Sequence, residues 1–284
     1  TYNFKSIFAW NIYLYVGFLV IVVVYLFTMM ERKANGYTKG IGIVAFVWRL
    51  ALTTGTGSIF GFLVARQGYD AAIMAPMFII MSFAYGLALY MLVLMFTFNT
   101  DDRPLGDHVL RRLKNLLGVF VAAIFYFTLV YHLTNLYGTE NHDFELFMLR
   151  DGGVYTVVFW FGWVLLGMIV PMGILFHPAL GMQRGAITLA ALLVVVGGLS
   201  AIYVIVIGGQ AFPLSMFPGH TIIESGNFDG VNGMAHSYSP SLPEVLLGLG
   251  GFALALMATF VAVRMMQFLP ESLADEVTDP HHAN

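Results

Sequence analysis

Three polar side chains follow one another along a single helical face within an otherwise apolar stretch of this sequence. Thr128, His132 and Asn135 stand at positions i, i+4 and i+7, so a helix places them on one side. Histidine accepts and releases protons, and its ring nitrogens can hydrogen-bond a quinone carbonyl. The stripe therefore predicts a site for protons or quinone. The alternative is a histidine that merely bonds a neighbouring helix.

Further residues beside this stripe could take part in the same chemistry. Tyr126 and Tyr131 occupy nearby helical faces and carry phenol groups that can hydrogen-bond. Glu140 and Glu145 follow just beyond the apolar stretch, and a carboxylate near a histidine can pass protons on. The candidates are His132, Glu140 and Glu145 for protons, and His132, Tyr131, Asn135 and Tyr126 for quinone.

A second polar stripe consists of Arg49, Thr53 and Thr56, again at i, i+4 and i+7. Polar groups at membrane depth are costly and usually face the interior of a helical bundle. The stripe predicts a proton or anion path from the cytoplasmic side, with Arg49 as a catalytic candidate. In the alternative interpretation Arg49 extends to the lipid headgroups, while the threonines bond backbone carbonyls.

Few kinds of redox centre can be ligated by this sequence. It has no cysteine, which excludes protein-ligated iron–sulfur clusters, Cys-type zinc sites and disulfides within the chain. A b-type haem usually takes paired histidines inside a bundle, and His132 is the only histidine clearly within an apolar stretch. A retinal Schiff base needs a lysine in the last apolar stretch, 243–268, which has none. We therefore expect no metal, haem or retinal in this chain.

The composition places these residues in a membrane. The 284 residues are 59% hydrophobic and 10% charged, with a mean hydropathy of +0.81, whereas soluble domains carry roughly 25% charged residues. A net charge of −3 gives no basic surface of the kind that nucleic-acid-binding proteins use. We expect an all-α, polytopic transmembrane helical bundle that does not bind nucleic acid.

Apolar runs between charged or Gly/Pro-rich breaks predict about seven spans, each of roughly 20 residues. We expect residues 1–284 to form a single transmembrane domain with an external loop at 212–242 and a cytoplasmic tail at 269–284. The Pro- and Gly-rich loop suits an ordered cap or a docking surface, with a flexible connector as the alternative. The expected spans are 8–30, 41–65, 72–98, 114–137, 154–177, 185–211 and 243–268.

Lysine and arginine are shared unequally between the two ends of these spans. Loops 31–40 and 99–113, the turn at Arg184 and the end at Arg264 carry most of them, whereas the other side has only Lys5, Arg66 and Arg150. Positive loops stay cytoplasmic, so we expect the N-terminus of this chain outside and the C-terminus inside. No signal peptide precedes the first span, so we expect an N-terminal portion to be missing.

Several short motifs occur in a fixed order along the chain. They are Ala75-Pro76-Met77-Phe78 with Ser82 and Gly86, Tyr131-His132-Leu133-Thr134-Asn135-Leu136-Tyr137 with Glu145, Phe159-Trp160 with Gly167 and Pro171, Gly208-Gly209-Gln210-Ala211-Phe212-Pro213-Leu214, and Phe217-Pro218-Gly219. In order and spacing they resemble the NrfD/PsrC family of membrane subunits, most of all its DsrP/HybB branch. Many members carry an acidic residue after the Phe-Trp pair, where this chain has Phe161, Gly162 and Trp163.

The resemblance implies a subunit that exchanges electrons and protons with menaquinone or another quinone and holds no metal cofactor. Its implied partners are a ferredoxin-like iron–sulfur subunit, a multihaem cytochrome c in the DsrP branch, and other membrane subunits. Longer members have about ten spans that begin in the cytoplasm, so seven spans beginning outside match a chain without its first three. The implied location is the cytoplasmic membrane of a bacterium or archaeon.

Taken together, these features predict a quinone-interacting integral membrane subunit of a respiratory oxidoreductase complex. It would pass electrons between membrane quinone and external iron–sulfur or cytochrome c subunits. A secondary transporter or channel is an alternative, because buried charge and Gly-rich helices also suit substrate sites. A purely structural membrane anchor is a third possibility.

Overall fold

The structure, a computed structural model, describes residues 3–100, 103–212, 240–266, 270 and 272–279. Within these residues, seven helical segments are long and apolar enough to cross a membrane. The expected all-α bundle of seven spans is therefore confirmed. Nearly all of the expected external loop 212–242 and part of the tail 269–284 lie outside the described residues. So do the motif residues 213, 214 and 217–219.

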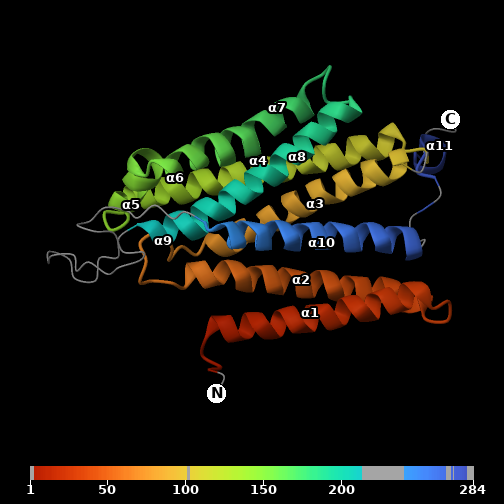
Figure 1. Ribbon diagram of the computed structural model, residues 1–284, viewed down its shortest axis with the longest axis horizontal. Coiled ribbons are helices and arrows are strands. Elements are labelled where there is room, and N and C mark those ends of the chain that lie inside the picture. Colours follow the sequence, from red (N-terminus) through yellow and green to blue (C-terminus); the bar gives the residue numbers. More distant parts are fainter. Residues whose placement is uncertain (1–2, 101–102, 213–239, 267–269, 271, 280–284) are drawn as a thin grey trace.

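Successive spans from α1 to α8 run in opposite directions along the bundle (Figure 1). Two of them include wider π-helical segments. The helical segments are α1 (Ile7–Met30), a 3-10 turn (Asn35–Tyr37), α2 (Thr38–Gly61), α3 (Met74–Thr100), α4 (Asp107–Tyr137), α5 (His142–Leu146), a π segment (Phe147–Asp151), α6 (Val154–Val157), a second π segment (Val158–Ile169), α7 (Val170–Phe176), α8 (Arg184–Tyr203), a third π segment (Val204–Gly208), α9 (Gly209–Ala211), α10 (Leu242–Met266) and α11 (Asp275–Thr278).

Two spans differ most from their expected bounds, and charged residues explain why both begin earlier than expected. Helix α2 begins at Thr38 rather than 41 and ends at Gly61 rather than 65, so Arg49 lies at its middle and not near one end. Helix α4 begins at Asp107, seven residues before the expected start at 114. Charged residues in the first turns of a helix can extend toward the headgroups, so they do not mark where the helix begins.

The turns alternate between the two ends of the bundle (Figure 1). The turns at 31–37 and 177–183 lie at the same end as α11, and the turns at 62–73 and 138–153 lie at the end where the chain starts. Loops that the charge distribution assigned to one side therefore do share one end. Which end faces the cytoplasm stays a prediction.

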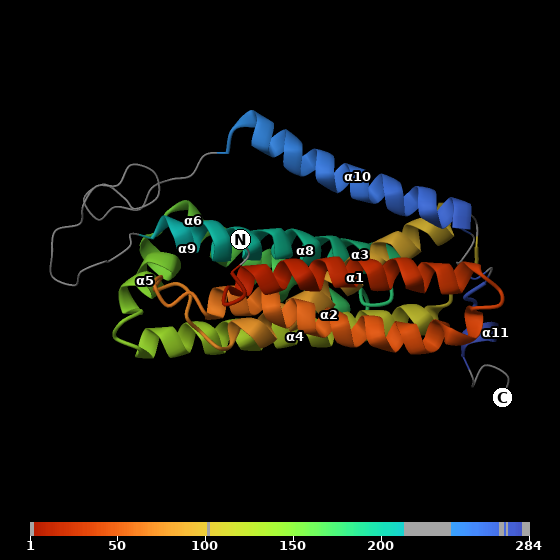
Figure 2. The ribbon, with the colours of Figure 1, turned by 90° about the horizontal axis from the view of Figure 1, so that it is seen from below.

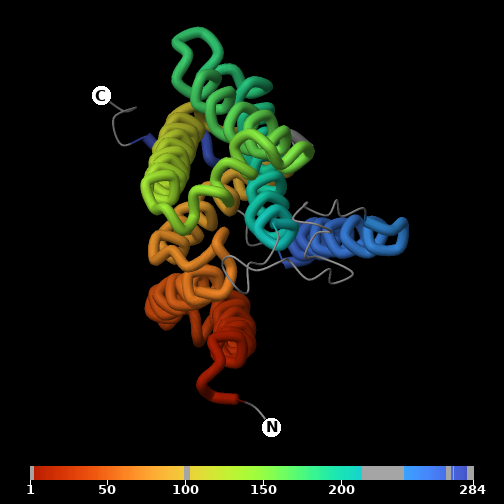
Figure 3. Tube along the Cα trace, turned by 90° about the vertical axis from the view of Figure 1, so that its left-hand side faces the viewer, coloured from red at the N-terminus to blue at the C-terminus, as the bar shows by residue number. Residues whose placement is uncertain are grey.

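Buried residues concentrate in the middle of the chain. The main apolar core is built from α3, α4, the segment Val154–Phe176 and α8. Helices α1 and α2 pack together at one side of this core, while α10 stands apart from it (Figures 2 and 3). No residue of Leu242–Met266 is buried. The candidate site lies within the core that these central spans build.

Helix α1 is held against α2 by contacts of Trp48 and Asn11. The indole Nε1 of Trp48 donates to the carbonyl of Leu14 at 2.9 Å, and its ring lies against Gly17. Asn11 of α1 is buried and meets the hydroxyl of Thr56 at 3.3 Å. These contacts join two helices that otherwise expose mostly apolar side chains.

Glycine brings the second π segment and α8 together at closest approach. A Cβ atom added to Gly197 would overlap the Cα of Gly167, and one added to Gly167 would meet Gly197 at 2.7 Å. Small residues allow membrane helices to approach this closely, which increases the packing contacts around the crossing. The crossing fixes the segment that carries Phe159 and Trp163 beside the candidate site.

Candidate functional site

A buried carboxylate and two side chains of α4 form a polar network. The ring Nδ1 of His132 lies 2.6 Å from Oε2 of Glu145, and Nδ2 of Asn135 donates to Oε1 of Glu145 at 2.9 Å. The Glu145 side chain is 0% exposed and that of His132 is 9% exposed. A buried carboxylate is costly unless its oxygens are hydrogen-bonded. Here both oxygens of Glu145 have a partner.

The turn after α4 brings these residues together. Helix α4 ends at Tyr137 and α5 starts at His142, so the chain reverses within four residues. The amide of Glu145 bonds the carbonyl of Asn141, which starts the short helix and directs Glu145 back toward α4. His132 and Asn135 share a helical face at i and i+3. The turn therefore brings Glu145 within hydrogen-bonding distance of His132 and Asn135.

One nitrogen of His132 has no hydrogen-bond partner among the described residues. That atom is the buried Nε2, because Nδ1 faces Glu145. With Nδ1–H donating to the carboxylate, a neutral imidazole presents Nε2 as an acceptor. The rings of Tyr131 and Phe159 lie edge to face against the imidazole at centroid distances of 4.9 and 4.8 Å. These contacts fix the orientation of the His132 ring, whose Nε2 can accept a proton.

Beside His132 lies a small cavity of about 20 Å³. This volume holds one water molecule, which needs roughly 10–15 Å³. It is far too small for a quinone ring. The other lining residues are Gly68, Met74, Met77, Tyr131, Phe144, Met148, Trp163, Val204 and Ile205.

The loop between α2 and α3 closes this cavity. The hydroxyl of Tyr131 donates to the carbonyl of Gly68 at 2.8 Å, and that of Tyr69 donates to the carbonyl of Ile205 at 3.0 Å. Arg66 donates to the carbonyl of Gln210 at 3.1 Å. Burial raises the pKa of Tyr69 to about 12, against the opposing effect of the Arg66 charge. Tyr69 therefore stays protonated and keeps its bond at physiological pH.

Trp163, which lines the cavity, comes from a π-helical stretch of the chain. Val158–Ile169 is π-helical and carries Phe159 and Trp163, whose rings meet edge to face at 5.7 Å. Pro171 is the second residue of α7, which continues this span, and it has no N–H to bond the carbonyl one turn back. Such π-helical turns often occur at functional sites, because they shift side chains relative to a regular helix.

Three predicted site residues lie apart from the network. Glu140 is exposed in the turn after α4, and Tyr126 is 61% exposed on the outer face of α4. Arg49 is exposed on α2, where its guanidinium lies 5.4 Å from the ring centre of Phe18. The structure thus brings together His132, Tyr131, Asn135 and Glu145 but not these three.

The threonines of the second stripe bond the backbone of their own helix. Thr53 donates to the carbonyl of Arg49 at 2.9 Å, and Thr56 donates to that of Leu52 at 3.0 Å. This is the bonding expected in the alternative interpretation of the stripe. Within the described residues, no group of three or more histidine or acidic side chains is arranged to hold a metal ion.

Comparison with known proteins gives one family and several relatives. The family model described as "Polysulphide reductase, NrfD" matches residues 1–214. The chain is 30% identical over 282 residues to "Hdr-like menaquinol oxidoreductase integral membrane subunit" of Archaeoglobus fulgidus, covering 98% of this chain and 69% of that protein.

Two further relatives are more distant. A protein of Mesobacillus selenatarsenatis that is named as a subunit of selenate reductase is 23% identical, with 83% of this chain and 53% of that protein covered. A "Putative dimethyl sulfoxide reductase membrane subunit" of Halobacterium salinarum is 28% identical, with 76% and 50% covered. The chain thus spans about half the length of these two relatives.

Proposed function

This chain belongs to the NrfD family, and we propose that it is the quinone-interacting membrane subunit of a respiratory oxidoreductase complex. Its relatives are named as subunits of a menaquinol oxidoreductase, a selenate reductase and a dimethyl sulfoxide reductase. The observation that supports a chemical role for this chain is the buried His132. One of its nitrogens is held by Glu145, the other has no hydrogen-bond partner among the described residues, and the residue lines a cavity that has room for one water.

In this proposal His132 moves protons and does not touch quinone. Quinol oxidation releases protons together with electrons, so a proton acceptor is needed near the membrane surface. A water in the cavity takes up a proton released by the quinol and passes one on to Nε2 of His132, so the water is unchanged, and the carboxylate of Glu145 stabilises the positive ring. Asn135 holds the carboxylate in place, and Tyr131 holds the loop over the cavity. These last two act as positioning residues.

Quinone contacts are proposed outside the His132 cavity, because that cavity is too small for the ring. Tyr126 faces outward on α4, where a quinone diffusing in the membrane could reach it. Its predicted role, and that of Arg49 in a path from the opposite side, stay predictions. A cation at the middle of a membrane helix is costly when it faces lipid. The exposed Arg49 therefore supports coverage of α2 by another membrane subunit.

We place the electron-transfer partners at the end of the bundle that holds the His132 network. The proposed partners are a ferredoxin-like iron–sulfur subunit and a multihaem cytochrome c. The turns 62–73 and 138–153 lie at that end and include residues that close the cavity. A proton released there emerges close to the site where the electrons would leave.

Purification of the chain from native membranes in mild detergent tests the proposed function. We expect an iron–sulfur protein or a cytochrome to copurify in fixed ratio, and the intact particle to oxidise a menaquinol analogue. Mass spectrometry identifies the subunits, and the absorbance of the quinone follows its oxidation. A homogeneous lone chain that transports a solute in liposomes would instead support a transporter.

Membrane orientation is testable with single cysteines because the chain contains none. We propose that the end with the turn 138–153 is external. Thr139→Cys, at an exposed position of that turn, should then react with a membrane-impermeant maleimide on intact cells. Gly36→Cys, at the other end and with open space around it, should react only after permeabilisation. The reverse labelling pattern would invert the orientation.

A further inference from the structure

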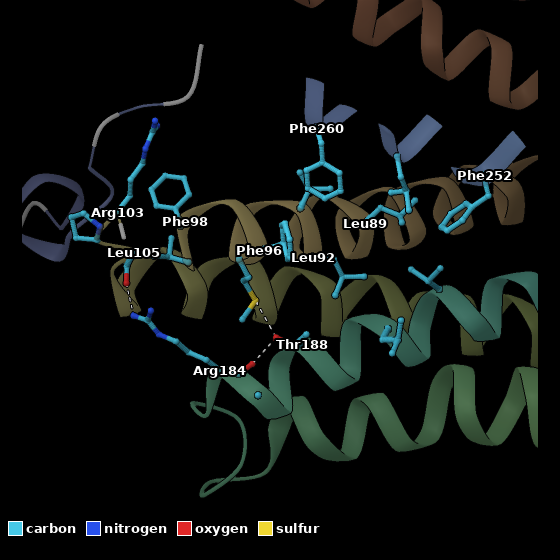
Figure 4. Close-up of a pocket in the computed structure, with 17 residues that line it drawn as sticks. Leu89, Leu92, Phe96, Phe98, Arg103, Leu105, Arg184, Thr188, Phe252 and Phe260 are labelled. Atoms are coloured by element: carbon cyan, nitrogen blue, oxygen red, sulfur yellow. Dashed lines mark hydrogen bonds between the residues drawn. The ribbon is translucent and has the colours of Figure 1, made fainter. Parts of the chain in front are cut away.

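A long groove lies between α3, α8 and α10, apart from the His132 network (Figure 4). Its volume is about 810 Å³, within the range of roughly 300–1,000 Å³ seen for small-molecule pockets. Helix α10 forms one wall, and no residue of Leu242–Met266 is buried against the other helices. The groove is therefore a space at membrane depth that the described helices line but do not fill.

The walls of the groove are apolar over a length similar to the thickness of one membrane leaflet. Phe96 and Leu89 of α3, Leu192 of α8 and Phe252 and Phe260 of α10 line it. Phe98, the last α3 residue of the lining, lies nine positions after Leu89, which is about 13 Å along a helix with a rise of 1.5 Å per residue. Half of a hydrocarbon core of about 30 Å is similar. The wall therefore matches acyl chains of a single leaflet.

Two arginines line one end of the groove, where α3 ends and α8 begins. Arg103 follows α3 and donates to the carbonyl of Pro270 at 3.3 Å. Arg184 begins α8, donates to the carbonyl of Leu105 at 2.5 Å and lies 3.7 Å from a carboxylate oxygen of Asp107. None of the seventeen lining residues is acidic. The lining at the headgroup end is therefore basic, with the carboxylate of Asp107 beside Arg184 outside the lining.

We propose that this groove binds an anionic phospholipid, with the phosphate at the end that Arg103 and Arg184 line and the acyl chains along the apolar wall. Guanidinium groups bind phosphate through paired, charge-assisted hydrogen bonds. Basic pockets between membrane helices bind acidic lipid headgroups. A neutral quinone or an apolar partner helix would fill the groove without using the hydrogen-bond donors of the two arginines as a phosphate does. The proposal does not depend on the chain being a quinone-linked subunit.

The test is a titration of phosphatidylglycerol onto the delipidated complex, read as bound lipid per particle by native mass spectrometry. We expect the double variant Arg103→Gln/Arg184→Gln to weaken binding by about 10- to 30-fold, since each cation near a lipid surface contributes about 1 kcal/mol. The matched control is Arg111→Gln/Arg112→Gln. These two arginines are exposed near the same end but do not line the groove. The control should bind like the unmodified complex.

A second variant separates shape from charge. Leu192→Trp fills the groove from its exposed position on α8 and leaves both arginines in place, so it should also weaken binding. It keeps the proposal testable should the arginine variant fail to assemble. Equal phosphatidylglycerol binding by all variants would overturn the proposal. So would a neutral menaquinone analogue that displaces the lipid and binds the arginine variant unchanged, because the groove would then be a quinone site.

Discussion

Replacing His132 with glutamine is expected to slow quinol oxidation by the intact complex by about 10²- to 10⁴-fold, the usual contribution of a general acid or base. Glutamine keeps an N–H that can donate to Glu145 but has no nitrogen that accepts and releases a proton. The subunits should still assemble, because the hydrogen bond to the buried carboxylate is retained. The measurement is steady-state oxidation of a menaquinol analogue by the purified complex.

The matched control is His142→Gln. His142 begins α5 close by but is exposed, and its ring lies 3.3 Å from the carbonyl of Leu136 rather than near Glu145. We expect this variant to keep its normal turnover. Normal turnover in His132→Gln, with the subunits present in their usual ratio, would remove His132 from the mechanism.

A companion pair distinguishes the two carboxylates that the sequence proposes. Glu145→Gln removes the charge that stabilises the protonated ring. We expect the rate of quinol oxidation to fall by roughly 10- to 100-fold, because a hydrogen bond to a charged group contributes about 1.5–3 kcal/mol. Glu140→Gln should have no effect, because Glu140 is exposed. A similar loss in both variants would place the proton route on the surface instead of through the buried network.

The spans were predictable from sequence because membrane helices must be long and apolar, a requirement that composition alone reveals. The exact ends of the spans were harder to predict. Arg111 and Lys114 lie inside α4, where Lys114 donates to the carbonyl of Leu175 at 2.7 Å. From the sequence alone, a charged residue that bonds another helix cannot be distinguished from a charged residue that marks the end of a span.

Helical spacing identified half of the site. It placed His132 and Asn135 on one face because i and i+3 neighbours depend only on the helix itself. It could not choose between Glu140 and Glu145, since that choice depends on how the turn after α4 folds back. Gly68 was missed altogether: it contributes a backbone carbonyl, which has no side-chain signature.

The contribution of Trp163 to the site also could not be predicted without the structure. In the sequence this residue marks a departure from the family pattern, where many members have an acidic group. In the structure it is 2% exposed and lines the cavity beside His132. Only the close packing of Val158–Ile169 against α8 reveals that position. The site therefore depends on a helix crossing to which Gly197, distant in sequence, contributes one side.

That crossing is the basis of the second large effect that we expect. Gly197→Leu should sharply reduce the amount of assembled complex, because its Cβ would overlap the Cα of Gly167. Overpacked cores lose about 1–3 kcal/mol when side chains can adjust. Here the obstacle is backbone, so the two helices must separate and carry Phe159 and Trp163 away from His132. Size-exclusion chromatography and the thermal midpoint of the solubilised complex measure the loss.

The control for this change is Gly173→Leu, on the span that carries Gly167, where nothing lies within 4 Å of an added Cβ. It adds the same side chain within the same pair of packed spans, so it corrects for any general effect of leucine on insertion. We expect it to assemble normally. Equal assembly of both variants would show that Gly167 and Gly197 are not in contact. The cavity wall formed by Trp163 would then lack its support, and the one-water geometry beside His132 would have to be abandoned.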